Sequence, residues 1–248
     1  MVRKVLWIVD GDMHRLVEAA KYVGASAVCI RTTNHWLKSS IKQIKKEKLD
    51  VFAWRWPAVE DEANSSHHYA MDEAKYVVDL INDEGLDGYI VDPEGDSGRS
   101  SDYWNDKKWA PLATKFSNMI ADAGKAKKPE FLFGTTSGCT YPTGFPHIPW
   151  TEFVGRSDAL FPQAYWVGDS GPEHGGTPQS SYAKAMKSWS RIASGKPIIP
   201  IIGQIAKVKS SEIRDYAELI HDHDIKEIHF YSFTLKVPKD SMDAMRDL

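Results

Sequence analysis

Cysteine is scarce in this sequence of 248 residues, which contains only two, and several other features are missing altogether. A single pair, Cys29 and Cys139, provides no disulfide framework, and Cys29 lies in an apolar run where a buried, inert thiol is expected. No apolar run approaches the ~18 residues that a membrane-spanning helix requires. The sequence therefore excludes the disulfide-rich class and predicts a chain with no membrane span.

An excess of positive charge is also missing. Lys and Arg together number 31 and Asp and Glu together number 34, which gives a net charge of -3. We therefore expect neither a nucleic acid nor an anionic membrane surface as partner. The apolar run of residues 5–9 is too short for a signal peptide and has no small-residue cleavage site. We expect synthesis as a soluble protein, which would reach the cell exterior or a virion, if it acts there, by another route.

Short apolar runs alternate with longer amphipathic segments along the whole chain. The predicted strands cover residues 4–10, 26–32, 50–56, 88–92, 130–135, 159–166, 197–203 and 227–233. The predicted helices cover residues 15–23, 37–47, 68–82, 109–123, 182–193 and 211–222. This alternation favours the α/β class and a closed (β/α)8 barrel, the TIM barrel, as a single domain over residues 1–248. A doubly wound open sheet is the alternative, but no Gly-x-Gly-x-x-Gly follows the first strand.

The carboxyl ends of the predicted strands carry most of the chemically capable side chains. Catalytic groups in active barrels gather at these ends and in the loops that follow them. The residues of interest there are Asp10, Asp12, Arg31, Trp54, Asp92, Glu94, Gln163, Tyr165, Trp166 and Tyr231. Trp54, Arg55 and Trp56 cannot all face the barrel axis, so either the two Trp or the Arg points inward. We interpret Arg31 first as a counter-ion for a barrel carboxylate and second as a substrate contact.

Asp92 and Glu94 are the strongest catalytic candidates. Side chains on a strand alternate between its two faces, so these carboxylates point the same way. Neighbouring carboxylates repel each other as anions, and one of them tends to keep its proton above the usual pKa. Cleavage of a glycosidic bond requires this asymmetry between two acids. The alternative is an acidic first turn of a helix, and for Asp10 the alternative is a cap of the following loop.

Residues 87–94, Asp-Gly-Tyr-Ile-Val-Asp-Pro-Glu, resemble the fourth-strand signature of family 18 glycoside hydrolases, the chitinases and their relatives, which reads Asp-Gly-x-Asp-x-Asp-x-Glu. The resemblance implies that Glu94 is the general acid and that Asp92 supports the N-acetyl group of the substrate. The family's Met-x-Tyr on the sixth strand corresponds to residues 163–165, which read Gln-Ala-Tyr. Ile90 departs from the signature, because it stands where the family has its first Asp.

The chain also resembles family 25 glycoside hydrolases, the muramidase lysozymes of phages and bacteria. That family opens with a strand that ends in Asp and carries Asp-x-Glu on its fourth strand, as do residues 8–10 and 92–94 here. Residues 160–165 are similar to its sixth-strand pattern as well. The family's extra Asp near the last strands has no counterpart, since residues 231–233 read Tyr-Ser-Phe.

Together these features predict a glycoside hydrolase that cleaves β-linked, N-acetylated amino-sugar polymers such as peptidoglycan or chitin. The predicted catalytic residues are Asp10, Asp92, Glu94 and Tyr165, and the predicted substrate contacts are Asp12, Arg31, Trp54, Gln163, Trp166 and Tyr231. We expect no metal and no organic cofactor, and the oligomeric state stays open. One alternative is a barrel that binds glycans without cleaving them. Another is a barrel enzyme of different chemistry, although no Lys closes a predicted strand to support a Schiff base.

Two long segments rich in turn residues, 136–150 and 168–178, separate predicted elements. Loops of this length in a compact domain are commonly functional, so we expect the first to wall the site. The second is either a lid or a surface excursion. Residues 221–224, His-Asp-His-Asp, are interpreted as a solvated turn rather than a metal site, because they precede the last strand at the end away from the chemistry.

Overall fold

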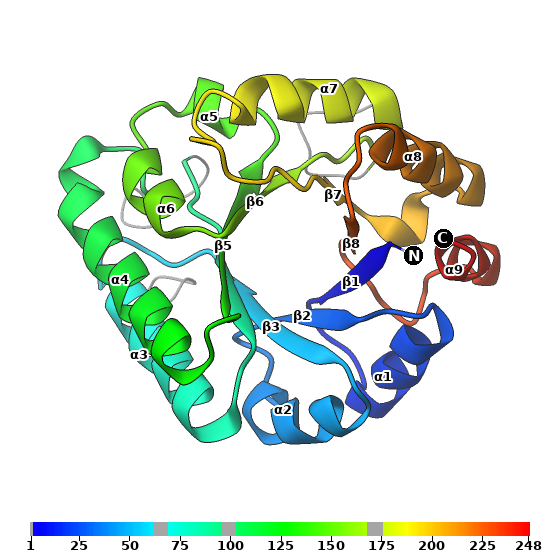
Figure 1. Cartoon of the computed structure of the whole chain (residues 1–248), viewed down its shortest axis with the longest axis horizontal. Helices are drawn as coiled ribbons and strands as arrows, with labels where there is room; N and C mark the ends of the chain where they lie inside the picture. Colours follow the sequence, from blue (N-terminus) through cyan, green and yellow to red (C-terminus); the bar gives the residue numbers. More distant parts are fainter. Residues whose placement is uncertain (1, 62–68, 96–102, 168–175) are drawn as a thin grey trace.

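The computed structural model of the chain describes residues 2–61, 69–95, 103–167 and 176–248. Its strands are parallel and close into a barrel in the chain order β1 to β8, and the helices form a ring outside it (Figure 1). The strands are β1 Arg3–Ile8, β2 Ala27–Arg31, β3 Asp50–Arg55, β4 Gly88–Val91, β5 Leu132–Gly138, β6 Ala159–Gln163, β7 Ile201–Ile202 and β8 Glu227–Phe230. Each overlaps one predicted run, so the prediction of a (β/α)8 TIM barrel is confirmed.

The predicted helices are also present, and three further ones appear. The helices are α1 Met13–Tyr22, α2 Leu37–Lys46, α3 Ala70–Asp79, α4 Ala110–Lys127, α5 Tyr141–Gly144, α6 Trp150–Arg156, α7 Pro178–Trp189, α8 Ser210–Asp222 and α9 Lys239–Arg246. Short non-α turns occur at η1 Leu80–Glu84, η3 Lys107–Trp109 and η4 Ile205–Lys207. The additional helices α5, α6 and α9 are short, so each offers too few turns for an apolar periodicity to be recognised in the sequence.

The buried side chains form two layers on either side of the sheet. Alternate strand positions pack inside the barrel, and they include Val5, Trp7, Cys29, Phe52, Trp54, Ile90, Phe161 and Ile201. The intervening positions pack against the helices. Trp54 and Trp56 therefore belong to the inner layer, whereas Arg55 lies on the helix side, close to the charge of Glu73. Of the two orientations that the sequence left open, the structure therefore has the two Trp pointing inward and the Arg pointing outward.

A chain of hydrogen bonds runs through the barrel interior from the amino-terminal ends of the strands. Arg3 contacts Asp50 at 2.8 Å and Glu227 at 2.6 Å, and Glu227 Oε1 lies 2.6 Å from His229 Nε2. The Trp7 indole N–H donates to His229 Nδ1 at 2.8 Å. Because an indole N–H can only donate, Nδ1 must accept, and Nε2 carries the proton that is donated to Glu227. The buried imidazole is thereby held in one tautomer.

This hydrogen-bond chain predicts how the stability of the fold depends on pH. Burial raises the pKa of Glu227, but the hydrogen bond from His229 and the charge and hydrogen bond of Arg3 outweigh it and bring the pKa to about 2. A depressed carboxyl pKa stabilises the fold at pH values above the ordinary value of 4.5, and this contribution is lost as the pH falls from there towards 2.

We therefore predict that Glu227→Gln lowers the free energy of unfolding by about 3 kcal/mol near neutral pH. The difference from wild type should shrink as the pH falls below about 4, which denaturant unfolding at several pH values will measure. Glu218→Gln, at an exposed position of α8, is the matched control and should change little. A deficit of Glu227→Gln that is the same at every pH would contradict the prediction.

Candidate active site

Two carboxylates follow strand β4 at the carboxyl end of the barrel. β4 ends at Val91, and Asp92 and Glu94 come directly after it. Asp92 is 3% exposed, and its Oδ2 accepts a hydrogen bond of 3.0 Å from Gln163 Nε2 at the end of β6. The other oxygen, Oδ1, is buried and has no hydrogen-bond partner in the described part of the chain. A buried acceptor left open in this way is a place where a ligand N–H can donate.

Burial changes the acidity of this pair. The pKa of Asp92 lies well above its usual range, because burial disfavours the anion and the charge of Glu94 repels it, while the Gln163 amide offsets only part of this. The pair therefore keeps a proton at a pH where isolated carboxyl groups have lost theirs. This raised pKa agrees with the asymmetry that the sequence pattern predicted.

Glu94 is partly buried and accepts a hydrogen bond from a side chain of α5, the short helix that follows β5. The Tyr141 O–H donates to Glu94 Oε2 at 3.2 Å. Tyr141 opens α5, and its ring lies over the end of β5, where a Cβ on Gly138 would come 2.4 Å from the ring. The sequence analysis expected residues 136–150 to line the site but did not single out Tyr141. The available signal was a Tyr that closely follows a glycine at the strand end, since the missing side chain leaves room for the ring.

Two tyrosine rings stack beside the carboxylates. Tyr165, after β6, and Tyr231, after β8, have ring centroids 5.4 Å apart and an angle of 5° between their planes. Burial raises the pKa of both phenols, and the nearby charges of Asp92 and Glu94 raise them further. Both phenols therefore remain protonated and able to donate. The structure thus gathers these four predicted residues at one end of the barrel.

Four aromatic side chains of the inner layer form what we call the aromatic floor: Trp7, Trp54, Trp56 and Tyr231. The Trp7 and Trp54 centroids are 5.5 Å apart, and Trp54 lies 5.2 Å from Trp56 and 5.8 Å from Tyr231. Trp7 and Trp54 are 1% and 2% exposed and form the buried base of this cluster, while the partly exposed Trp56 and Tyr231 offer flat ring surface that suits the face of a sugar. Trp7 thus has the core role that its apolar strand predicts.

Three further predicted residues make other contacts in the structure. Asp10 is exposed and accepts a hydrogen bond of 2.7 Å from the next backbone N–H, and Asp12 caps α1 by accepting from the Arg15 N–H at 2.9 Å. Strand β1 ends at Ile8, so alternation no longer orients these two acids. Trp166 is 1% exposed and stacks on Tyr216 of α8 at 5.5 Å. It therefore packs in the core between sheet and helices and is not part of the proposed site.

Arg31 ends β2 at the same end of the barrel and is partly buried. Its guanidinium lies 5.6 Å from the centroid of the Trp56 ring. Arg31 Nε is buried and has no hydrogen-bond partner among the described residues. The barrel carboxylate that the sequence analysis expected as its counter-ion does not pair with it in that part of the chain.

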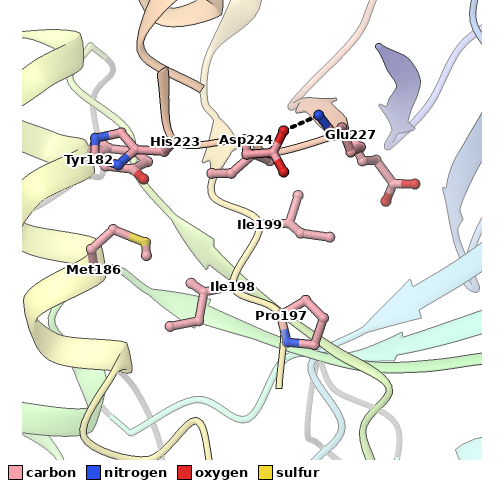
Figure 2. A pocket seen from close by; sticks show the side chains of 10 residues that line it. Tyr182, Met186, Pro197, Ile198, Ile199, His223, Asp224 and Glu227 are labelled. Atoms are coloured by element: carbon pink, nitrogen blue, oxygen red, sulfur yellow. Dashed lines mark hydrogen bonds and ion pairs between the residues drawn. The ribbon is translucent and has the colours of Figure 1, made fainter. Parts of the chain in front are cut away.

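A hollow lies at the opposite end of the barrel, where β7 and β8 begin (Figure 2). Its volume is about 450 Å³, and the stacked rings of Tyr182 and His223, 4.9 Å apart, form part of its wall. Asp224 pairs with Lys226, and Glu227 pairs with Arg3, so the carboxylates of this hollow are already neutralised within the protein.

The described residues contain no group of three or more His, Cys, Asp or Glu side chains that could hold a metal ion. Across the same residues, every helix is too short or too polar to traverse a bilayer. The segment 168–178, expected to be either a lid or a surface excursion, lies mostly outside the described residues, which omit 168–175.

No protein-family model matches the sequence, and no curated protein matches it either. Solved structures do match the fold. A glycoside hydrolase family 18 N-acetylglucosaminidase from Paenibacillus barengoltzii is 11% identical, with a TM-score of 0.66 and coverage of 100% of this chain and 99% of that one. The spore cortex-lytic enzyme SleL of Bacillus megaterium QM B1551 is 7% identical, with a TM-score of 0.64 and coverage of 99% and 73%.

A protein of a different kind shares the fold as well. The xylanase-α-amylase inhibitor protein XAIP-III is 14% identical, with a TM-score of 0.63 and coverage of 100% of this chain and 98% of that one. Identities this low show a common fold and nothing finer. The chain therefore has the fold of glycoside hydrolase barrels, including a family 18 enzyme, as one resemblance implied. The resemblance to family 25 stays an expectation.

The packing of Tyr165 generates a prediction. A Cβ on Gly203 would come 2.0 Å from the Tyr165 ring, so Gly203→Ala must displace that ring from its stack with Tyr231. We expect a loss of about 1–3 kcal/mol in the free energy of unfolding and a changed near-ultraviolet circular dichroism spectrum. Gly155→Ala in α6 is the control, since nothing lies within 4 Å of its Cβ position. Equal stability of the two variants would show that the ring is not held there.

Proposed function

We propose that this chain is a glycoside hydrolase that cleaves β-linked, N-acetylated amino-sugar polymers with retention, with Glu94 as general acid and base. The observation that carries the proposal is the environment of Asp92. This carboxyl group is buried, fixed through one oxygen by Gln163, and open at the other oxygen beside Glu94. A purely structural acid would use both oxygens within the protein.

In the first step Glu94 protonates the leaving glycosidic oxygen, and in the second step it takes a proton from the attacking water. Glu94 is partly buried, it accepts a hydrogen bond from Tyr141, and the neighbouring Asp92 has a raised pKa, which together suit a group that alternates between acid and base. The substrate's own acetamido oxygen serves as the nucleophile. That pathway is an exception to the scheme in which two protein carboxylates act as acid and nucleophile.

Asp92 and Tyr165 would hold the acetamido group during this step. The open Oδ1 of Asp92 accepts the acetamido N–H, while the protonated Tyr165 phenol donates to the acetamido oxygen. Because Gln163 fixes Asp92 beforehand, little orientational freedom is lost when the substrate arrives. The aromatic floor supplies apolar surface for the face of a sugar ring. An N-acetylglucosaminidase and a spore cortex-lytic enzyme share the fold, which supports amino-sugar polymers as the substrate class.

A second function is favoured by one specific observation. Ile90 stands two residues before Asp92 and is fully buried in the inner layer. The family 18 signature has an acid at this position. A barrel with an apolar side chain there can bind a glycan without cleaving it, and a protein named as an inhibitor shares the fold. The two functions differ in whether sugar is released.

We predict that wild-type protein releases reducing sugar from chitooligosaccharides or peptidoglycan and that Glu94→Gln reduces the rate by roughly 100-fold to 10,000-fold. The loss follows from removal of the proton donor at nearly constant shape. Release is measured by chromatography of the products, and Glu218→Gln serves as an exposed control that should keep wild-type rates.

Saturable binding of these glycans by wild type, with release no greater than that of Glu94→Gln, would favour the binding module. Neither binding nor release from either polymer would reject both functions. Rates that Glu94→Gln leaves unchanged would remove Glu94 from the mechanism.

A further inference from the structure

The mouth of the barrel contains a cation that the proposed reaction does not use. Arg31 is the last residue of β2. Ala27 and Cys29 of the same strand pack inside the barrel, so alternation turns Arg31 towards the barrel axis as well. Its guanidinium lies over Trp56 of the aromatic floor at 5.6 Å. Its charge also acts on the second phenol of the site, because it lowers the pKa of Tyr231. Arg31 is therefore close to the place that the proposed function assigns to sugar.

The pairing of Arg31 differs from that of the arginine at the other end of the barrel. Arg3 is neutralised by Asp50 at 2.8 Å and by Glu227 at 2.6 Å. Arg31 forms no ion pair in the described part of the chain, and its buried Nε has no acceptor there. A partly buried guanidinium with an unsatisfied N–H is costly unless an acceptor arrives with a ligand.

We propose that Arg31 binds a carboxylate group of the glycan, so that the site prefers an acidic amino-sugar polymer to a neutral one. This inference rests on the proposed function for the kind of polymer, but not for its cleavage. The planar fork of a guanidinium matches a carboxylate with two parallel hydrogen bonds.

A glycan can carry this carboxylate in two ways. It stands either on an acidic substituent of the amino sugar itself, as in peptidoglycan strands freed of their peptides, or on a uronic acid that alternates with the amino sugar, as in hyaluronan. The chemistry at Arg31 is the same in both cases. A neutral chitooligosaccharide therefore shows whether a carboxylate is needed at all, and comparison of the two acidic glycans shows which source of the carboxylate is preferred.

The test is calorimetric binding of three soluble probes: a chitooligosaccharide, a peptidoglycan fragment and a hyaluronan oligosaccharide. Glu94→Gln is the parent, so that no probe is cleaved during the measurement. Adding Arg31→Gln should weaken binding of at least one acidic probe by roughly 10-fold to 100-fold and leave the neutral probe within about 2-fold. Arg31→Lys should be intermediate, because it keeps the charge but loses the fork.

Two further variants guard the interpretation. Arg31→Met keeps an apolar stem against Trp56, so it should behave like Arg31→Gln even if the glutamine disturbs packing. Arg15→Gln removes one exposed positive charge from the first turn of α1 and should leave all three affinities unchanged. Thermal unfolding of each variant confirms that the fold is retained.

Equal weakening of acidic and neutral probes, or no acidic probe bound by the parent, would overturn the assignment of Arg31. If cleavage by otherwise wild-type protein depends on Glu94 while Arg31→Gln shows no selectivity, the proposed function stands and this inference fails. If acidic probes bind through Arg31 while no glycan is cleaved, the inference stands and the hydrolase function fails.

Discussion

The hydrogen bond from Gln163 to Asp92 connects the parts of the molecule on which its chemistry depends. It reaches from the end of β6 to the residue after β4, across the intervening strand β5. β5 carries glycine at positions 134 and 138, where an added side chain would collide with the rings of Phe161 and Tyr141. The bond fixes one oxygen of Asp92, while burial and the charge of Glu94 raise its pKa.

Alternation along the strands made much of this arrangement predictable. It placed Asp92 and Glu94 on one face, and it placed Gln163 and Tyr165 on one face of the sixth strand. Closure of the barrel then brings these faces to a common axis, which is why residues about 70 positions apart, 92 and 163, are in contact. The sequence could not show that Gln163 bonds to Asp92, because alternation gives the face of each side chain but not its distance from a side chain two strands away.

Prediction from the sequence was weakest where strands end and where an aromatic ring has two possible roles. Asp10 and Asp12 follow β1 by a few residues, in a turn whose geometry is set by the cap of α1 rather than by the sheet. Trp166 was predicted as a substrate contact but lies on the helix side of the sheet, whereas Trp7, which was not singled out, lies on the inner side. Both rings read as apolar in sequence, and only the side of the sheet on which each lies separates them. The position of Tyr141 could not be predicted, because it lies in the four-residue helix α5, which is too short to show an apolar periodicity.

The aromatic floor has a consequence for how this barrel can diversify. Its Trp7 ring is held by a hydrogen bond to His229, which contacts Glu227 and through it Arg3 at the amino-terminal ends of the strands. The loops of the rim can be lengthened or exchanged while those contacts stay in place. The packing of the interior is thus separate from the loops of the rim, where variation in ligand selection can arise. Attempts to redirect this scaffold to new ligands should begin with rim positions and leave these interior contacts intact.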